Sequence, residues 1–230
     1  MKTINVAVLV SGGGSNLQAL IDKQSSRVKG PASTAGRRSG DKLQNYKISL
    51  VISNNPEAYA LERAKKARIE TLILAAKKYK KRLEYAKALV RELKKRDIDV
   101  VCLAGFMLIL HPYFIRNFRN CVLNIHPALL PAFGGEGMYG LHVHEAVLKS
   151  KAKVSGCTVH FVDEGCDTGP VILQKKVPVL RNDTPDMLAK RILKYEHKIY
   201  PQALKLFASG KLRIKGKRAF TKQCQSIKVS

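Results

Sequence analysis

The 230-residue sequence has no tryptophan, and aromatic residues make up only 7% of it. Acidic residues are also few: 17 stand against 42 lysines and arginines, a net charge of +25. No apolar run approaches the roughly 20 residues that a membrane-spanning helix requires, so we predict no membrane contact. The apolar start "INVAVLV" (4–10) is not followed by a small-residue cleavage site. We therefore predict a buried strand there and not a secretion signal.

Cysteine is scarce and odd in number, and no two cysteines have the CxxC spacing. The five are Cys102, Cys121, Cys157, Cys166 and Cys224. A disulfide framework needs paired cysteines and an oxidising compartment. We therefore predict free thiols and a cytoplasmic location.

The positive charge is concentrated in residues 75–97 and 211–228, with few aromatic residues between the basic ones. The apolar positions of the first segment keep the spacing of one helix face; they are Leu83, Ala86, Leu89, Val90 and Leu93. We therefore interpret its lysines as the solvated face of a helix. Weak attraction of small anions is the next interpretation, and we expect no nucleic-acid partner, because charge alone names no ligand.

Strand-like and helix-like segments alternate along the chain. Strands are predicted at 4–10, 46–54, 69–74, 97–105 and 121–126, and helices from Ser15, at 56–67 and within 75–97. A helix starting at 140–150, an antiparallel strand pair at 152–162 and 169–179, and a closing helix at 183–207 follow. The pattern predicts an α/β fold, a mostly parallel twisted sheet flanked by helices, with an antiparallel C-terminal extension. We predict one domain at 1–207 with a flexible insertion at 24–45, and a polar tail at 208–230.

A glycine turn, "VSGGGSNLQAL", links the first strand to the first helix. It is not a P-loop, which would need lysine where Gly14 stands, and not a dinucleotide fingerprint, which would need glycine at Leu17. Glycines allow close backbone approach, and a helix start attracts anions. We predict a phosphate site on Gly14, Ser15 and Asn16. The alternative is a tight turn in which Ser15 caps the helix.

The stretch "VLNIHPALLPAF" places Asn124 and His126 two residues apart on a strand, so that both project from the same face. Pro127 ends the strand, and ligands bind at the carboxyl ends of strands in open α/β sheets. An amide donor beside an imidazole can stabilise an oxyanion and move a proton. The spacing is equally compatible with a hydrogen-bonded buried histidine and a turn-making asparagine.

The turn "DEGCDTGP" supplies a carboxylate, Asp167, between two predicted strands. It could approach His126 and raise the pKa of the imidazole. The alternative is an exposed acidic turn. The "DTG" letters also occur in aspartic proteases, but those need two such aspartates, and the sequence has one copy.

The remaining titratable residues give weaker signals. "HVHE" offers His142, His144 and Glu145, but residues two apart on a helix point in different directions, so we predict no metal site. His160 is most simply a histidine in a core strand. Glu196 could accept hydrogen bonds from sugar hydroxyls or lie on the helix surface.

These stretches together resemble the phosphoribosylglycinamide formyltransferases, a family of purine biosynthesis. The resemblance rests on "VLVSGGGSNLQALID", "VISN", "VVCLAGFMLIL", "LNIHPALLPAF", "VSGCTVHFVDEGCDTGPVILQ" and "EHKIYPQAL", in this order. It covers nearly the whole chain except the insertion and the tail. It implies a Rossmann-like formyltransferase fold and the transfer of a formyl group from 10-formyltetrahydrofolate to the amine of 5′-phosphoribosylglycinamide, through a tetrahedral oxyanion.

The resemblance also implies residue roles. Asn124 would hydrogen-bond the oxyanion and the formyl group, and His126, kept protonated by Asp167, would donate a proton. The phosphate would lie on Gly14, Ser15 and Asn16, with Glu196 at the ribose. The folate pterin would lie along Met107, Leu108, Ile109 and Leu110, and Arg82 near the folate tail. Small molecules are the expected partners of a monomer or homodimer, with no metal.

Three departures from the family pattern and two rivals limit this interpretation. Leu108 replaces a common arginine, Gly13 replaces a bulkier residue, and "FGGEGMYGLH" (133–142) is longer than usual. Methionyl-tRNA formyltransferase and formyltetrahydrofolate deformylase resemble the same catalytic stretches, but each has a further domain that we do not expect here. A phosphate- or RNA-binding module without catalysis is the alternative from another class.

Overall fold

In the computed structural model, residues 3–25 and 45–221 are described. The predicted insertion, apart from its ends, and residues 222–230 lie outside these ranges. Nine strands of the described part form one sheet in the order β3-β2-β1-β4-β5-β6-β7-β9-β8. They are β1 (Ile4–Val10), β2 (Tyr46–Ser53), β3 (Glu70–Ile73), β4 (Val100–Leu103), β5 (Val122–His126), β6 (Val154–Phe161), β7 (Val171–Pro178), β8 (Leu212–Lys215) and β9 (Arg218–Thr221).

The sheet changes from parallel to antiparallel at β5. Strands β3, β2, β1, β4 and β5 pair in parallel, whereas β6 runs antiparallel to both β5 and β7. The predicted fold class, with its antiparallel extension, is confirmed. The parallel half needs helical crossovers, and these place helices on both faces of the sheet.

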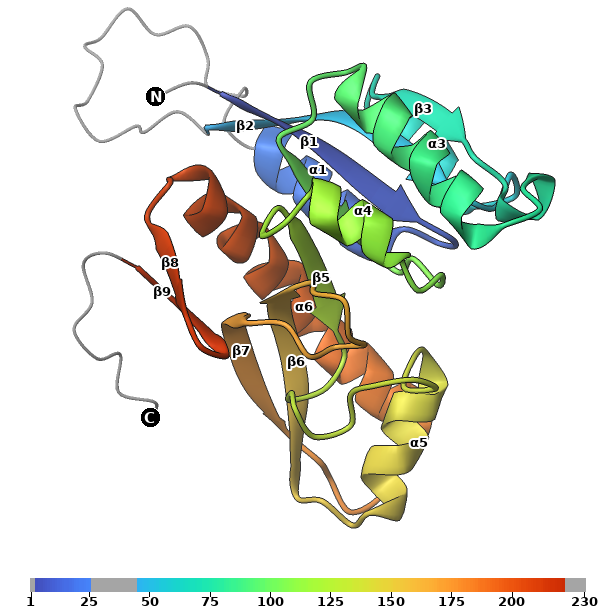
Figure 1. Ribbon diagram of the computed structural model, residues 1–230. Coiled ribbons are helices and arrows are strands. Elements are labelled where there is room, and N and C mark those ends of the chain that lie inside the picture. Colours follow the sequence, from blue (N-terminus) through green and yellow to red (C-terminus); the bar gives the residue numbers. More distant parts are fainter. Residues whose placement is uncertain (1–2, 26–44, 222–230) are drawn as a thin grey trace, which may run out of the picture.

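Two groups of helices cover the two faces (Figure 1). On one face lie α3 (Arg82–Lys94) and α4 (Pro112–Asn117). On the other lie α1 (Ser15–Ser25), α2 (Tyr59–Lys66), α5 (Leu141–Lys149) and α6 (Pro185–Ala208). None of the helices within the described ranges combines the length and apolar character needed to cross a bilayer.

Strand β1 shows why the sequence needs both helical layers. Val6, Val8 and Val10 pack into the core that contains α1 and α6, whereas Ala7 and Leu9 pack into the core that contains α3. All five side chains are fully buried. A strand without a polar face is stable only between two apolar layers, which the continuous run "VAVLV" predicts.

The lysine-rich segment differs in its start from the prediction. A short 3-10 turn, η1 (Ala76–Lys78), comes first, and α3 begins only at Arg82. Leu83, predicted to be apolar and inward, is 36% exposed, because it lies in the first turn. Helix α4 was not predicted. It begins with Pro112 at its first position, and the preceding His111 side chain caps it by accepting a hydrogen bond from the Tyr113 amide at 3.1 Å.

The first part of the predicted polar tail has regular structure. Residues 212–221 form the hairpin of β8 and β9, and β9 adds to the sheet beside β7. Leu212 and Ile214 alternate with Arg213 and Lys215, but each strand has only four residues, too few for hydrophobic periodicity to give a clear signal. The four cysteines within the described ranges are free thiols, and Cys224 lies outside them.

Helix α6 starts as predicted, with the Thr184 hydroxyl accepting a hydrogen bond from the Met187 amide and with Pro185 in its first turn. Further along, the buried Tyr200 hydroxyl lies 2.9 Å from the carbonyl oxygen of Leu103 and 3.1 Å from that of Leu123. These contacts fix α6 against the end of β4 and the start of β5. The helix therefore forms a wall at the edge where the predicted site residues lie.

Candidate active site

Strand β5 carries Asn124 and His126 to the carboxyl end of the parallel half of the sheet. The two side chains share one face, as their spacing predicts, and His126 is the last residue of the strand. The antiparallel neighbour β6 places His160 opposite Asn124 and Thr158 opposite His126. The change of strand direction thus brings a second histidine to the same place.

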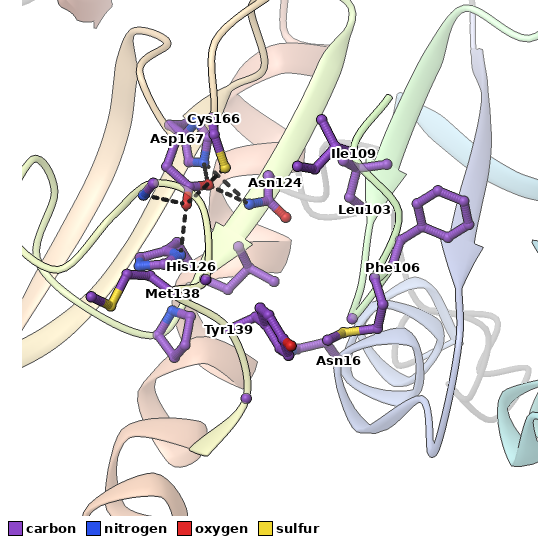
Figure 2. A pocket seen from close by; sticks show the side chains of 18 of the residues that line it. Asn16, Leu103, Phe106, Ile109, Asn124, His126, Met138, Tyr139, Cys166 and Asp167 are labelled. Atoms are coloured by element: carbon purple, nitrogen blue, oxygen red, sulfur yellow. Dashed lines mark hydrogen bonds and ion pairs between the residues drawn. The ribbon is translucent and has the colours of Figure 1, made fainter. Parts of the chain in front are cut away.

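Asp167 joins this group from the loop between β6 and β7 (Figure 2). Its Oδ2 lies 3.4 Å from Nδ1 of His126 and accepts a hydrogen bond from the Gly135 amide at 3.2 Å. Its Oδ1 lies 3.5 Å from both Asn124 Nδ2 and His160 Nε2. The predicted approach of Asp167 to His126 is therefore present, and the alternative of an exposed acidic turn is wrong.

Close backbone packing holds the Asp167 loop. Asp167 has a positive φ of 57°, a conformation that few non-glycine residues adopt. A Cβ at Gly169 would lie 1.9 Å from the Phe161 carbonyl oxygen, and one at Gly134 would lie 2.5 Å from a Leu130 methyl carbon. Only glycine allows these approaches, which explains the "DTG" letters without a protease role.

The pKa of His126 shifts in the direction opposite to the sequence prediction. Burial lowers it, and although the Asp167 charge and the Phe133 carbonyl act to raise it, they do not offset the burial. His126 is only 3% exposed, so its charged form loses most of its hydration. Nε2 lies 2.8 Å from the Phe133 carbonyl oxygen and Nδ1 lies 3.4 Å from Asp167 Oδ2, so both ring nitrogens face acceptors. Asp167 thus acts on the pKa of His126 in the predicted direction, but burial outweighs its effect.

Asp167 remains a carboxylate. Burial acts to raise its pKa, but the neighbouring His160 and His126 and the hydrogen bond from the Gly135 amide together lower it below the usual range. A carboxylate beside a neutral imidazole stabilises that ring whenever it takes up a proton. The pair can therefore accept a proton and hold it briefly.

His160 belongs to the site, although the sequence indicated only a core histidine. It is 1% exposed, its Nδ1 lies 2.8 Å from the Phe161 carbonyl oxygen, and its Nε2 lies 3.2 Å from Asn124 Nδ2. Because the carbonyl only accepts, we assign the proton to Nδ1, which leaves Nε2 to accept from Asn124. His160 thus orients the Asn124 amide. The signal was strand pairing: "TVHFV" aligned antiparallel to "VLNIH" places the two residues opposite each other.

A cavity of about 640 Å³ opens beside these residues. Its wall includes Asn124, His126, His160 and Asp167, together with all four of the predicted folate residues, 107–110. Met107 and Ile109 are each more than half exposed, which leaves apolar surface available to a ligand. Arg82 does not line the cavity; its Nη2 donates to the Ile109 carbonyl at 2.9 Å and so supports the apolar segment from behind.

The cavity lining also includes Asn16 and Glu196. Glu196 is buried, and its Oε2 accepts a hydrogen bond from Asn16 Nδ2 at 2.7 Å, so the alternative of a surface glutamate is wrong. Burial raises the pKa of Glu196, against the effect of the Asn16 hydrogen bond. The Asn16 side-chain amide is thereby directed to Glu196, and an anion contact of Asn16 stays a prediction. Gly14 and Ser15 lie outside the cavity lining.

The "HVHE" residues separate as their helical spacing predicts. His142 Nδ1 lies 3.4 Å from Glu145 Oε2 at the surface, whereas His144 is buried. Across residues 3–25 and 45–221, no group of three or more histidine, cysteine, aspartate or glutamate side chains that could hold a metal ion is found.

The buried histidines predict that the protein loses stability in acid. Burial lowers the pKa of His126, His144 and His197 below the ordinary 6.5. The folded state therefore binds fewer protons than the unfolded state, so stability is full above about pH 6.5 and falls as the pH drops through the folded-state pKa values. We expect the urea unfolding midpoint to fall between about pH 7.5 and pH 5.5.

Two variants separate this effect from a general response to pH. His144→Gln removes one buried imidazole, so its midpoint should depend less on pH, while His142→Gln, at an exposed histidine, should match the parent chain. A midpoint that rises towards acid pH would contradict the assignment.

Comparison with known proteins agrees with this geometry. Residues 4–204 match the formyl transferase family. The chain is 40% identical to a phosphoribosylglycinamide formyltransferase of Escherichia coli K12, over 92% of this chain and 90% of that protein. It is 41% identical to glycinamide ribonucleotide transformylase 1 from Symbiobacterium toebii, a solved structure that it matches with a TM-score of 0.84 over 95% of this chain and 94% of that one.

Longer relatives contain the same region. The chain is 45% identical to part of the trifunctional purine biosynthetic protein adenosine-3 of Bos taurus, over 93% of this chain but 19% of that protein. It thus spans about a fifth of the length of that relative. The family match covers most of the chain, and it includes the strand ends and the loop that carry the site. The chain therefore belongs to the formyl transferase family.

Proposed function

We propose that the chain transfers the formyl group of 10-formyltetrahydrofolate to the amine of 5′-phosphoribosylglycinamide, a step of purine biosynthesis. The observation that carries the proposal is the position of Asp167, whose carboxylate oxygens lie within 3.5 Å of Asn124, His126 and His160 on the wall of one cavity. An amide donor, a neutral imidazole and a carboxylate are the groups that acyl transfer to an amine requires.

Two parts of the cavity lining suit the two substrates. The apolar wall of residues 107–110 suits the flat pterin of the folate. The part at Asn16 and Glu196 adjoins the glycine turn and suits a sugar and its phosphate. The amine and the formyl group would then meet between them, beside Asn124 and His126. Leu108, which stands where the family often has an arginine, is partly buried against the core. Folate binding here would therefore depend on apolar contact and not on a charge at this position.

The chemistry follows from the protonation states. The amine lone pair forms a bond to the formyl carbon, and the carbonyl electron pair moves to the oxygen, which Asn124 stabilises as an oxyanion with an amide hydrogen. His126, neutral at rest, takes the proton from the attacking nitrogen, and Asp167 stabilises the resulting imidazolium. As the oxyanion collapses, the bond from carbon to folate N10 breaks, and N10 receives the proton from His126. Tetrahydrofolate leaves, and no bond to the enzyme forms.

A release assay tests the proposal. The purified chain is mixed with 10-formyltetrahydrofolate, with and without 5′-phosphoribosylglycinamide, and tetrahydrofolate release is followed. We expect release only when the ribonucleotide is present, together with one formylated product per tetrahydrofolate. Release that is independent of the ribonucleotide would indicate a deformylase, and no release under either condition would indicate a binding module.

A further inference from the structure

Helix α2 holds the glycine turn between β1 and α1. The helix lies next to the turn in space, although more than 40 residues separate the two along the chain. The Gly12 carbonyl accepts a hydrogen bond from the Ala60 amide at 3.0 Å, and the Gly13 carbonyl accepts one from Nε of Arg63 at 2.8 Å. The Gly14 carbonyl accepts from the Gln18 amide at 2.9 Å. All three glycine carbonyls are therefore bonded, two of them to α2.

These carbonyl contacts fix the direction of the amides. In a trans peptide unit the C=O and the N–H point in opposite directions. The contact of Gly13 with Arg63 thus turns the Gly14 amide away from α2, and the contact of Gly12 does the same for the Gly13 amide. Among the described residues, no acceptor lies against the amides of Gly13, Gly14 or Ser15. They are free to bind an anion.

Helix α2 also packs closely against the turn at Gly14. A Cβ at Gly14 would lie 2.6 Å from the Cβ of Ala60, and Gly14 has a φ of 71°. A Cβ at Gly13 would meet nothing within 4 Å, in accord with the bulkier residue that the family often has there. Helix α2 is therefore in close contact with the turn at Gly14 and leaves space for a side chain at Gly13.

The Arg63 side chain is held in place from three directions. Besides the Gly13 carbonyl, its Nη1 donates to Gln18 Oε1 at 3.1 Å, and its guanidinium lies 5.0 Å from the centre of the Tyr59 ring. Gln18 in turn donates to Asp22 at 2.8 Å. The other basic residues at this end of α2 lack these contacts. Lys65 forms an ion pair with Glu62 at 2.8 Å, and Lys66 is exposed.

We propose that Arg63 is a positioning residue for the substrate phosphate: it orients the amides of the glycine turn through its hydrogen bond to the Gly13 carbonyl. This proposal rests on the proposed function, because the phosphate is that of the ribonucleotide. The guanidinium fork is essential to it, since one group must reach both the turn and Gln18.

Steady-state kinetics of three variants test the role. Arg63→Ala should raise KM for the ribonucleotide about tenfold, the usual worth of a hydrogen bond from a charged group, with kcat and KM for the folate unchanged within about twofold. Arg63→Lys retains the charge but not the fork and should recover only part of the loss. Lys66→Ala removes a charge from the same helix without a contact to the turn and should behave like the parent chain.

Inorganic phosphate separates failure of this proposal from failure of the proposed function. Its binding, measured by calorimetry, does not depend on which phosphorylated substrate the chain uses, and Arg63→Ala should weaken it. An unchanged KM and unchanged phosphate affinity in Arg63→Ala would overturn the proposal, as would a fall in kcat with KM unchanged. If Arg63→Ala does not fold, full ribonucleotide and phosphate affinity in Arg63→Lys would overturn it equally. A parent chain that binds phosphate but transfers no formyl group would instead contradict the proposed function alone.

Discussion

Replacing His126 with alanine is expected to lower kcat by about 10²–10⁴-fold, the usual contribution of a positioned acid or base. The side chain is the group of the site that can take the amine proton and pass it to the folate nitrogen, with Asp167 3.4 Å from its Nδ1. The binding of 5′-phosphoribosylglycinamide should persist, since its proposed contacts, the glycine turn and Glu196, lie on other elements. Turnover and calorimetric binding, measured on the same preparation, separate the two effects.

Two further variants make this result specific. His126→Gln can still donate to the Phe133 carbonyl but cannot carry a proton, so it should be as inactive as alanine if proton transfer is the role. His142→Ala, at the exposed histidine of α5, should keep full turnover. A His126→Gln variant with more than about a tenth of the parent turnover would contradict acid–base catalysis by this residue.

The second large effect is expected from Asp167→Asn, with a fall in kcat of about 10²-fold or more. The amide keeps the shape and can still accept from the Gly135 amide, but it cannot stabilise the imidazolium that forms on His126. It also replaces the carboxylate oxygen that lies 3.5 Å from Nε2 of His160, the residue that orients Asn124. The effect therefore falls on kcat, not on the binding of either substrate.

The pH profile adds a direction to this test. The Asp167 charge acts to raise the pKa of His126 against the effect of burial, so its removal lowers that pKa further. Activity that requires a neutral imidazole is lost as the pH falls through this pKa, and the acidic limb of kcat should therefore move to lower pH in Asp167→Asn. Glu164→Gln, a surface change in the same loop at the partner of Arg116, should leave the limb in place. A shift to higher pH would contradict the assigned role.

The sequence predicted the fold well where hydrophobic patterns are strong. The apolar runs of β1 and β5 and the capped start of α6 at Thr184 appear where they were expected. It failed where structure depends on distant partners. The β8–β9 hairpin has two strands of only four residues and forms by adding to an edge of the sheet, and α4 is too short for its spacing to give a signal.

The candidate site divides in the same way. Residue type and spacing on one strand singled out Asn124 and His126, because period-two geometry is local. The membership of His160 and the burial of Glu196 could not be inferred, because both depend on which strand or helix lies opposite. The pKa of His126 was predicted in the wrong direction for a related reason: the neighbouring carboxylate is visible in the sequence, but the loss of hydration is not.

By itself, the sequence determined the layered α/β architecture, the glycine turn and the three residues Asn124, His126 and Asp167, since backbone conformation and side-chain periodicity are set by near neighbours. Only the tertiary structure decided the protonation of His126, the partner of Asn124 and the hold of Arg63 on the Gly13 carbonyl. These depend on burial and on contacts between segments far apart in the chain, and no local pattern encodes either.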